Sequence, residues 1–121
     1  MRIYIAHPTD MNYENEIYRP LQSDDFFSQY ELILPHEESN KINNTRDDYK
    51  DVDIVIAECS KPSTGVGIEL GWFYDEEKPI YCLYKIGTKP SEAVTAIAKE
   101  IIEYSDSNDL VEKIKTIMDY F

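Results

Sequence analysis

Apolar runs alternate along this chain with segments in which apolar and polar residues mix. RIYIA (2–6), YELILP (30–35) and VDIVIAEC (52–59) are short runs rich in β-branched and aromatic residues. The third is nearly continuous in apolar side chains, as is typical of a strand covered on both faces. KPIYCLYK (78–85) and EIIEYS (100–105) predict a fourth and a fifth strand.

Amphipathic segments between these runs predict helices. The first is interrupted or restarted near Pro20, because proline lacks an amide hydrogen. The last has Asp106 or Ser107 as its N-cap. The predicted helices cover residues 13–27, 65–77, 91–99 and 107–121. The polar segment 36–51 predicts a loop with one or two helical turns around 44–51.

Alternating strands and helices predict a parallel sheet with right-handed crossovers. Five strands in 121 residues indicate one flavodoxin-like (Rossmann-like) α/β domain over residues 1–121. We expect a three-layer sandwich around a five-stranded parallel sheet of order 2-1-3-4-5. Ligands of such sheets bind beyond the carboxyl ends of the strands, near the switch in strand order. The residues that follow each strand are therefore the candidates for a ligand site.

Composition narrows the class of partner. The net charge of −12 opposes binding to nucleic-acid polymers and to anionic membranes. There is no apolar stretch of about 18 residues for a membrane span, and MRIYIAHPTD is too short and polar for a secretory signal. Cys59 and Cys82 lie in strand-like runs, which favours buried thiols in the cytoplasm over a disulfide or metal pair.

The segment ECSKPSTGVGIELGWF (58–73) holds three of the four glycines and follows the strongest predicted strand. Gly65 and Gly67 indicate unusual backbone angles or close approach of a ligand. The amides of the helix that starts there would bind a phosphate or carboxylate, with hydroxyl donors from Ser63 and Thr64. Neither a P-loop nor a dinucleotide fingerprint fits, because G-K-[ST] is absent and the third glycine comes one residue late.

Glu69 is a lone acid among Ile68, Leu70, Trp72 and Phe73. We expect it in the first turn of the helix, where the helix dipole keeps a carboxylate ionised. An ionised carboxylate at the mouth of a ligand crevice suits a nucleophile. The alternative interpretation is an acid that stabilises the helix start and has no chemical role.

The run DIVIAECSKPSTGVGIELGWF…KPIYCLYK resembles the signature region of the nucleoside 2-deoxyribosyltransferase superfamily, most of all its 2′-deoxynucleoside 5′-phosphate N-hydrolase branch. The similarity covers roughly residues 52–85. The residues that match are Asp53, Ala57, Glu58, Pro62, Ser63, Gly65, Gly67, Glu69, Leu70, Gly71, Cys82 and Leu83. The resemblance implies a dimer or larger homo-oligomer that cleaves an N-glycosidic bond without metal or cofactor.

The resemblance also implies roles. Glu69 would attack the anomeric carbon and form a glycosyl ester, which water resolves by hydrolysis or an incoming base by transfer. Tyr4 matches a tyrosine that hydrogen-bonds this glutamate, although a core aromatic role is equally open. Ser63 occupies the place where the hydrolases hold the 5′-phosphate and the transferases carry an aspartate. Ser63, Gly65 and Gly67 therefore favour a nucleotide.

Some positions depart from the family pattern. Thr45 stands where the family has the acid that protonates or positions the base, so Asp47 or Asp48 would have to serve. His7 and Pro8 replace a Gly-Ser pair after the first strand. His7, Pro8 and His36 are candidate contacts to the sugar or base, and either histidine is a candidate for proton transfer.

A second phosphate contact, a hydroxyl from the neighbouring subunit, would fall near Ser91 or Thr95.

Three functions follow as hypotheses. The first is hydrolysis of a 2′-deoxynucleoside 5′-monophosphate to base and deoxyribose 5-phosphate. The second is transfer of deoxyribose between bases. The third is a nucleotide-binding sensor without turnover. The sequence leaves the base preference and the tolerance of ribose open.

Overall fold

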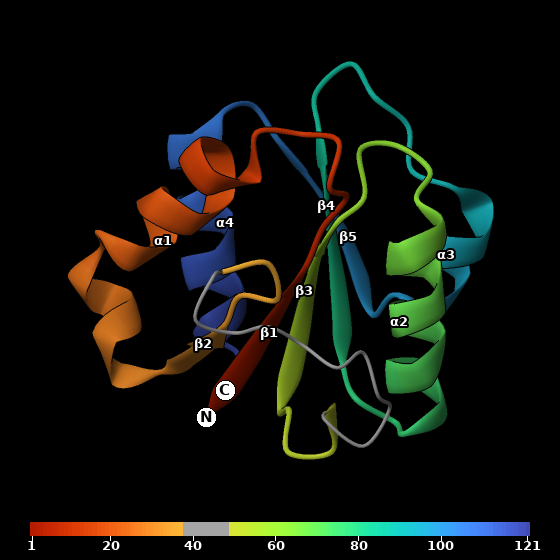
Figure 1. Ribbon diagram of the computed structural model, residues 1–121, viewed down its shortest axis with the longest axis horizontal. Helices are drawn as coiled ribbons and strands as arrows, with labels where there is room; N and C mark the ends of the chain where they lie inside the picture. The colour runs from red at the N-terminus through yellow and green to blue at the C-terminus, as the bar shows by residue number, and fades with distance from the viewer. Residues whose placement is uncertain (38–48) are drawn as a thin grey trace.

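The computed structural model describes residues 1–37 and 49–121. Its centre is a five-stranded, all-parallel sheet of order β2-β1-β3-β4-β5 (Figure 1). The strands are β1 Arg2–Ala6, β2 Glu31–Ile33, β3 Ile54–Glu58, β4 Ile80–Lys85 and β5 Glu100–Tyr104. The flavodoxin-like α/β fold and the strand order predicted from the sequence are both confirmed.

Helices cover both faces of the sheet (Figure 1). One layer holds a π-helical turn at Glu14–Tyr18, α1 at Arg19–Gln22, a 3₁₀ helix at Asp25–Gln29 and α4 at Ser107–Met118. The other layer holds α2 at Thr64–Asp75 and α3 at Glu92–Ile97. The sheet is therefore the middle of three layers.

Alternating strand residues divide the apolar core in two. Ile3, Ile5, Ile54 and Ile56 pack with α1 and α4, whereas Tyr4, Val55 and Ala57 pack with α2. All five residues of β3 are buried, which explains its continuous apolar sequence. Each fully buried large aliphatic side chain stabilises the fold by about 1.5–3 kcal/mol.

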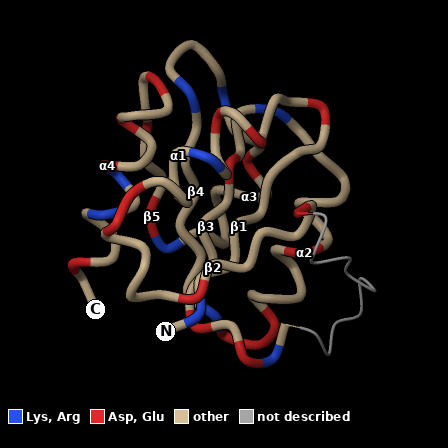
Figure 2. The backbone as a smooth tube through the Cα atoms, turned by 60° about the vertical axis from the view of Figure 1, so that its left-hand side comes forward, with Lys and Arg blue, Asp and Glu red and all other residues tan. Residues whose placement is uncertain are grey.

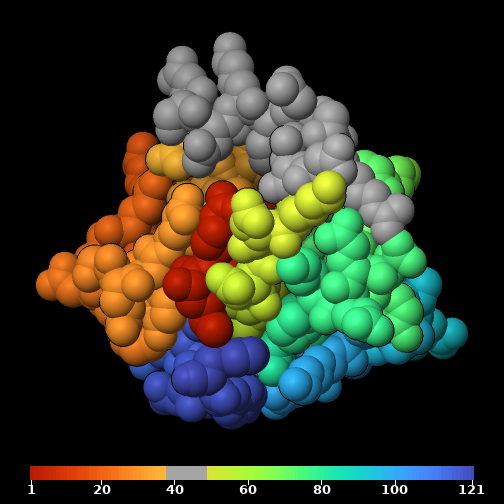
Figure 3. All heavy atoms as spheres, turned by 90° about the horizontal axis from the view of Figure 1, so that it is seen from below, coloured from red at the N-terminus to blue at the C-terminus, as the bar shows by residue number. Residues whose placement is uncertain are grey.

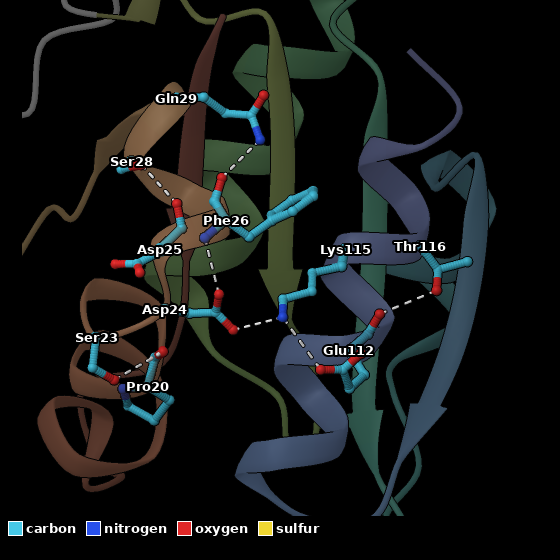
Figure 4. Close-up of polar contacts among 10 residues, drawn as sticks. All are labelled: Pro20, Ser23, Asp24, Asp25, Phe26, Ser28, Gln29, Glu112, Lys115 and Thr116. Carbon is cyan, nitrogen blue, oxygen red and sulfur yellow. Dashed lines mark hydrogen bonds and ion pairs between the residues drawn. The ribbon is translucent and has the colours of Figure 1, made fainter.

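The first helical region differs from the prediction of one helix interrupted near Pro20. Pro20 lies in the first turn of α1, where its missing amide hydrogen costs no hydrogen bond. α1 ends at Gln22 with Ser23 as its C-cap, and the carboxylate of Asp24 accepts from the amide of Phe26 at 3.0 Å to start the 3₁₀ helix. Asp24 also pairs with Lys115 of α4 at 2.6 Å, which ties this segment to α4 within the same layer (Figure 4).

The starts of the other helices are set by N-capping side chains. Ser63 caps α2, Ser91 caps α3 and Asp106 caps α4, each accepting from the third amide that follows. The second candidate cap of α4, Ser107, is its first residue. The helix predicted over 91–99 ends at Ile97, because Lys99 donates its amide to the carbonyl of Ile80 and leads into β5.

Arg2, at the start of β1, ties this strand to its two neighbours at the lower end of the sheet. Its guanidinium pairs with Glu31 at 3.0 Å and its amide donates to Asp53 at 2.7 Å. Figure 3 shows the first residues between those of the β2 region and those that lead into β3. Acidic residues are spread over many elements rather than gathered on one (Figure 2). Within residues 1–37 and 49–121, no helix has the length and apolar character that a membrane crossing needs.

Candidate active site

A cavity of about 330 Å³ opens where the carboxyl ends of β1 and β2 face the start of α2. This is the edge of the sheet at which the strand order switches, between β1 and β3. The residues that line it are His7, Thr9, Pro35, His36, Tyr49, Ser63, Gly65, Val66, Ile68, Glu69 and Trp72. We call it the first cavity. It brings five of the predicted site residues together: His7, His36, Ser63, Gly65 and Glu69.

Glu69 and Tyr4 form a hydrogen-bonded pair at the wall of the first cavity. The Tyr4 hydroxyl donates to Oε2 of Glu69, and the tyrosine itself is fully buried. Burial and the neighbouring carboxylate raise the pKa of Tyr4 far above its ordinary value, so its hydroxyl keeps its proton. Tyr4 therefore holds Oε2 of Glu69, and no hydrogen bond from a described residue occupies Oε1.

The position of Glu69 in α2 differs from the prediction. α2 begins at Thr64, so Glu69 lies in its second turn and no acid lies in the first. The predicted dipole effect on its ionisation is therefore wrong, since that effect fades beyond the first turn. Burial instead raises the pKa of Glu69 above its ordinary value, and the hydrogen bond from Tyr4 acts in the opposite direction.

The start of α2 presents polar groups to the same space. Ser63 Oγ accepts from the amide of Val66 at 3.4 Å, which leaves its own hydroxyl hydrogen for another acceptor. The first amides of a helix have no carbonyl partner within it. An anion bound here would therefore meet a hydroxyl and backbone N–H groups together.

The glycines of this helix do not adopt the unusual backbone angles that the sequence suggested. Gly65 and Gly67 are helical, and Gly87 is the only described glycine with positive φ. A Cβ added at Gly65 or Gly67 would meet nothing within 4 Å. Both glycines lie within the first two turns of α2, so the helical backbone needs no special residue there, and their effect is to keep the helix surface open.

A second cavity of about 330 Å³ lies on the other side of Ser63. It shares Ser63 and Val66 with the first cavity and adds Gly67, Ser91 and Lys61. Lys61 is half-exposed and pairs with Asp10 at 3.2 Å. Lysine and arginine are absent from the described lining of the first cavity, so the second cavity is the one with a basic side chain. Thr95, the alternative to Ser91, is not among the lining residues described.

His7 lines the first cavity but has both ring nitrogens occupied. Nδ1 lies 2.8 Å from the carbonyl oxygen of Pro8, and Nε2 lies 2.6 Å from the hydroxyl of Tyr18. Burial is the main cause that lowers the pKa of His7 to about 4. His7 is thus a neutral, hydrogen-bonded wall residue, which argues against a role in proton transfer.

The remaining predicted residues fall in different places. Pro8 is buried and contributes its carbonyl to His7, and it is not among the described residues that line the first cavity. His36 is exposed and lines the first cavity. Asp47, Asp48 and Thr45 lie outside the described residues. Cys59 and Cys82 are free and buried, as predicted.

Sequence reasoning missed two tyrosines. Tyr49 is buried, its hydroxyl lies 3.5 Å from that of Tyr4, and it lines the first cavity. An aromatic residue in the otherwise polar segment 36–51 was the signal that could have found it. Tyr18 contacts His7, but nothing distinguishes it in the sequence from the other tyrosines of the chain. Trp72 also lines the cavity, and its ring centroid lies 5.9 Å from that of Tyr49.

Comparison with known proteins supports the resemblance seen in the motif. No family model matches the chain. A protein of Thermofilum pendens that carries the provisional name 2′-deoxynucleoside 5′-phosphate N-hydrolase 1 is 30% identical over 76 residues, which is 57% of this chain and 52% of that protein. The chain spans about half the length of the curated relatives it matches.

Solved structures share the fold over nearly the whole chain. The CMP N-glycosidase of Clostridium botulinum superposes with a TM-score of 0.67 at 19% identity, covering 95% of this chain and 99% of that one. A 2-deoxyribosyltransferase of Bacillus psychrosaccharolyticus gives 0.59 at 20% identity, over 91% and 90%. These two structures show the fold of the chain, and the curated relatives support the resemblance of its β3–α2 motif to the nucleoside 2-deoxyribosyltransferase superfamily.

Proposed function

We propose that this protein hydrolyses the N-glycosidic bond of a 2′-deoxynucleoside 5′-monophosphate and releases the free base and deoxyribose 5-phosphate. The observation that carries the proposal is the Glu69 carboxylate, held by Tyr4 at the wall of a cavity whose far side reaches the start of α2. The relatives named as nucleotide N-hydrolases support the choice of substrate.

The chemistry needs two displacements at C1′. Oε1 of Glu69 attacks C1′, the C1′–N bond breaks, and the base leaves with the electron pair and takes up a proton. The Tyr4 hydroxyl stays on Oε2 and keeps the carboxylate oriented. Water then attacks C1′, the ester bond to Glu69 breaks, and the proton of the water leaves to solvent. Two inversions give retention, as in a retaining glycosidase.

Substrate binding divides between the two cavities. The base and sugar would occupy the first, against His7, His36 and Trp72. The phosphate would lie near Ser63, Gly65 and Gly67, with Lys61 and Ser91 at the adjoining cavity. This places the anion beside hydroxyl, amide and ammonium donors, and away from Glu69. Pro8 would support the base side of the first cavity, because its carbonyl oxygen holds His7. Asp47 or Asp48 would protonate the base.

A base-release assay across deoxynucleosides and their monophosphates tests the proposal. We expect release of free base from a monophosphate, and expect denatured protein mass to rise by one deoxyribosyl phosphate when turnover is quenched early. Release from neither substrate class at high protein concentration contradicts the proposal.

Replacing Ser63 by Asp tests the phosphate side. A second carboxylate there repels a phosphate, so kcat/KM for the monophosphate should fall about tenfold or more relative to that for the nucleoside. Ser91→Asp is the matched variant in the second cavity. Equal losses for nucleoside and monophosphate would mean that Ser63 does not contact the phosphate.

A second candidate function is transfer of deoxyribose to another base. The described lining of the first cavity holds no basic side chain, which suits an uncharged nucleoside, and the 2-deoxyribosyltransferase shares this fold. Adding a second free base separates the two candidates. A new nucleoside indicates transfer, and free base alone indicates hydrolysis. Nucleotide binding without turnover, equal in wild type and Glu69→Ala, would instead indicate a sensor.

We also propose a homodimer or larger homo-oligomer in the cytoplasm. The outer face of α2 exposes Ile68 and Tyr74, at 50% and 57%, beside the open surface of Gly67 and Gly71. An apolar helix face of this kind is typical of a protein interface. Two free buried thiols are typical of a reducing compartment. Sedimentation of wild type and Ile68→Glu checks the assembly, and only a shift toward monomer in the variant supports this face.

A further inference from the structure

We propose that Tyr18 is a positioning residue of the first cavity, whose hydroxyl joins His7 to the backbone of His36 and so fixes the wall that meets the base. The inference rests on the proposed function for the identity of the ligand. Its geometry rests on contacts outside the Glu69–Tyr4 pair. Tyr18 is not among the described residues that line the first cavity, so it acts through its two histidine partners.

The hydroxyl of Tyr18 lies at the centre of a chain of three hydrogen bonds. It is 2.6 Å from Nε2 of His7 and accepts from the backbone amide of His36 at 2.9 Å. Nδ1 of His7 lies 2.8 Å from the carbonyl oxygen of Pro8. The chain therefore connects the end of β1, the π-helical turn and the residue that follows β2 and Pro35.

The positions of the protons follow from the partners. The Pro8 carbonyl can only accept, so the hydrogen of His7 lies on Nδ1. Nε2 then carries a lone pair and accepts from the Tyr18 hydroxyl, whose oxygen in turn accepts from His36. Every donor in this chain has one acceptor. Burial raises the pKa of Tyr18, so its hydroxyl remains a donor.

Ring packing makes the three residues one unit. His7 and Tyr18 are 3% and 4% exposed, and their rings meet edge to face at 5.1 Å. The exposed ring of His36 lies 5.2 Å from that of His7. Tyr13 stacks on His7 at 4.6 Å and lies 5.7 Å from His36. An exposed side chain on a loop is thus supported from below by buried rings and from its own backbone by Tyr18.

In this arrangement, the residues proposed to position the base are different from those proposed to cleave the bond. Glu69 and Tyr4 are held by α2 and β1, and neither contacts Tyr18 through a described hydrogen bond. A displaced His36 wall would weaken contact with the base throughout the reaction. Loss of the Tyr18 hydroxyl should therefore raise KM and leave kcat nearly unchanged, as expected when an interaction present in ground and transition state is removed.

Tyr18→Phe removes the hydroxyl and keeps the ring. We expect KM for the deoxynucleotide to rise about tenfold and kcat to stay within about twofold. Tyr81→Phe is the matched control, since Tyr81 is 2% exposed in the same apolar core and its described ring contacts are with Tyr120 and Phe121, not with a histidine. A fall in kcat at constant KM, or the same rise in KM for Tyr81→Phe, overturns the proposal.

Nitrogen-15 NMR of the histidine rings gives a readout that does not need turnover. In wild type, His7 should show one protonated nitrogen, Nδ1, and one hydrogen-bonded lone pair on Nε2. Tyr18→Phe should shift the Nε2 resonance and Tyr81→Phe should not. An unchanged His7 spectrum in Tyr18→Phe overturns the proposal.

Failure of the proposed function can be told apart from failure of this inference. If wild type releases no base, calorimetric titration with a deoxynucleoside monophosphate replaces the kinetic test. The inference then requires about tenfold weaker binding by Tyr18→Phe than by Tyr81→Phe. Equal affinities overturn it, and so does absence of binding by the wild type.

Discussion

Two buried tyrosine–glutamate pairs lie on opposite faces of the sheet, and they differ in how the carboxylate is satisfied. Glu58, the last residue of β3, is 4% exposed and accepts from the amide and the hydroxyl of Ser60, both at 2.7 Å, and from the hydroxyl of Tyr104. Glu69 accepts from Tyr4 alone among the described side chains and lines the first cavity.

The difference shows what makes one acid structural and the other available for chemistry. The Ser60 hydroxyl that donates to Glu58 also accepts from the amide of Lys85 at 2.8 Å, so this node joins the ends of β3, β4 and β5. The carboxylate oxygens of Glu58 are therefore hydrogen-bonded to groups of the protein itself. Glu69 also accepts from a tyrosine, but no described residue donates to its second oxygen, and it lines a cavity in which a ligand fits. Reactivity therefore depends on what is left unsatisfied, and not on burial alone.

The largest effect should come from Glu69→Gln. An amide cannot form the glycosyl ester, so kcat for base release should fall about a thousandfold or more, while the fold is kept. Glu77→Gln, at the other end of α2, removes the same charge as a control. Retention of more than a tenth of the wild-type rate would show that Glu69 is not the nucleophile.

Glu58→Ala should act on the stability of the fold, in contrast to the effect of Glu69→Gln on kcat. It leaves the buried hydroxyl of Tyr104 and two donors of the half-buried Ser60 without their acceptor, so the free energy of unfolding should drop by about 3 kcal/mol. Denaturant unfolding measures this, with Glu69→Ala as the matched variant, for which we expect a smaller loss. Greater destabilisation by Glu69→Ala would contradict the distinction between the pairs.

Tyr4→Phe should lower kcat about tenfold to a hundredfold, because the carboxylate loses a donor that orients it. The hydrogen bond from Tyr4 lowers the pKa of Glu69, and burial raises it. Removing the bond should therefore move the acid limb of the pH–rate profile to higher pH. A limb that stays in place, or moves to lower pH, would show that Tyr4 does not act on the ionisation of Glu69.

Tyr104→Phe should have the smallest effect. Glu58 Oε2 keeps the hydroxyl of Ser60 as a donor, so the loss should be about 1 kcal/mol of stability with kcat unchanged. Thermal unfolding and base release measured on the same preparation check both parts. A fall in kcat comparable to that of Tyr4→Phe would mean that the Glu58 node also shapes the site.

The sequence predicted the fold well, because its signals are local. The apolar run of β3, the turn residues and the strand–helix alternation favoured the flavodoxin-like winding, and the strand order of the structure agrees with it. The resemblance indicated Glu69 and Tyr4 together. The predictions were wrong where a capping residue determines the start or end of a helix. Ser63 starts α2 early enough to put Glu69 in its second turn, and Asp24, not Pro20, divides the first helical region.

The tyrosine network was beyond prediction for a physical reason. Tyr18 and Tyr49 have apolar rings that suit any core, and only the tertiary fold decides which hydroxyls meet His7 or Tyr4. The same holds for the hydrogen-bond partners of Glu58 and Glu69. The number of donors around each depends on residues far apart in sequence, such as Tyr104.

The shared wall between the two cavities has a consequence for the order of events. If the substrate lies across Ser63 and Val66 as proposed, cleavage leaves the base and the phosphate end in separate compartments. The base can depart while the sugar remains esterified and anchored. What enters the vacated compartment next, a water molecule or another base, then selects between breakdown and salvage of the deoxyribose. The fate of the glycosyl ester would then depend on whether water or a base enters the first cavity first.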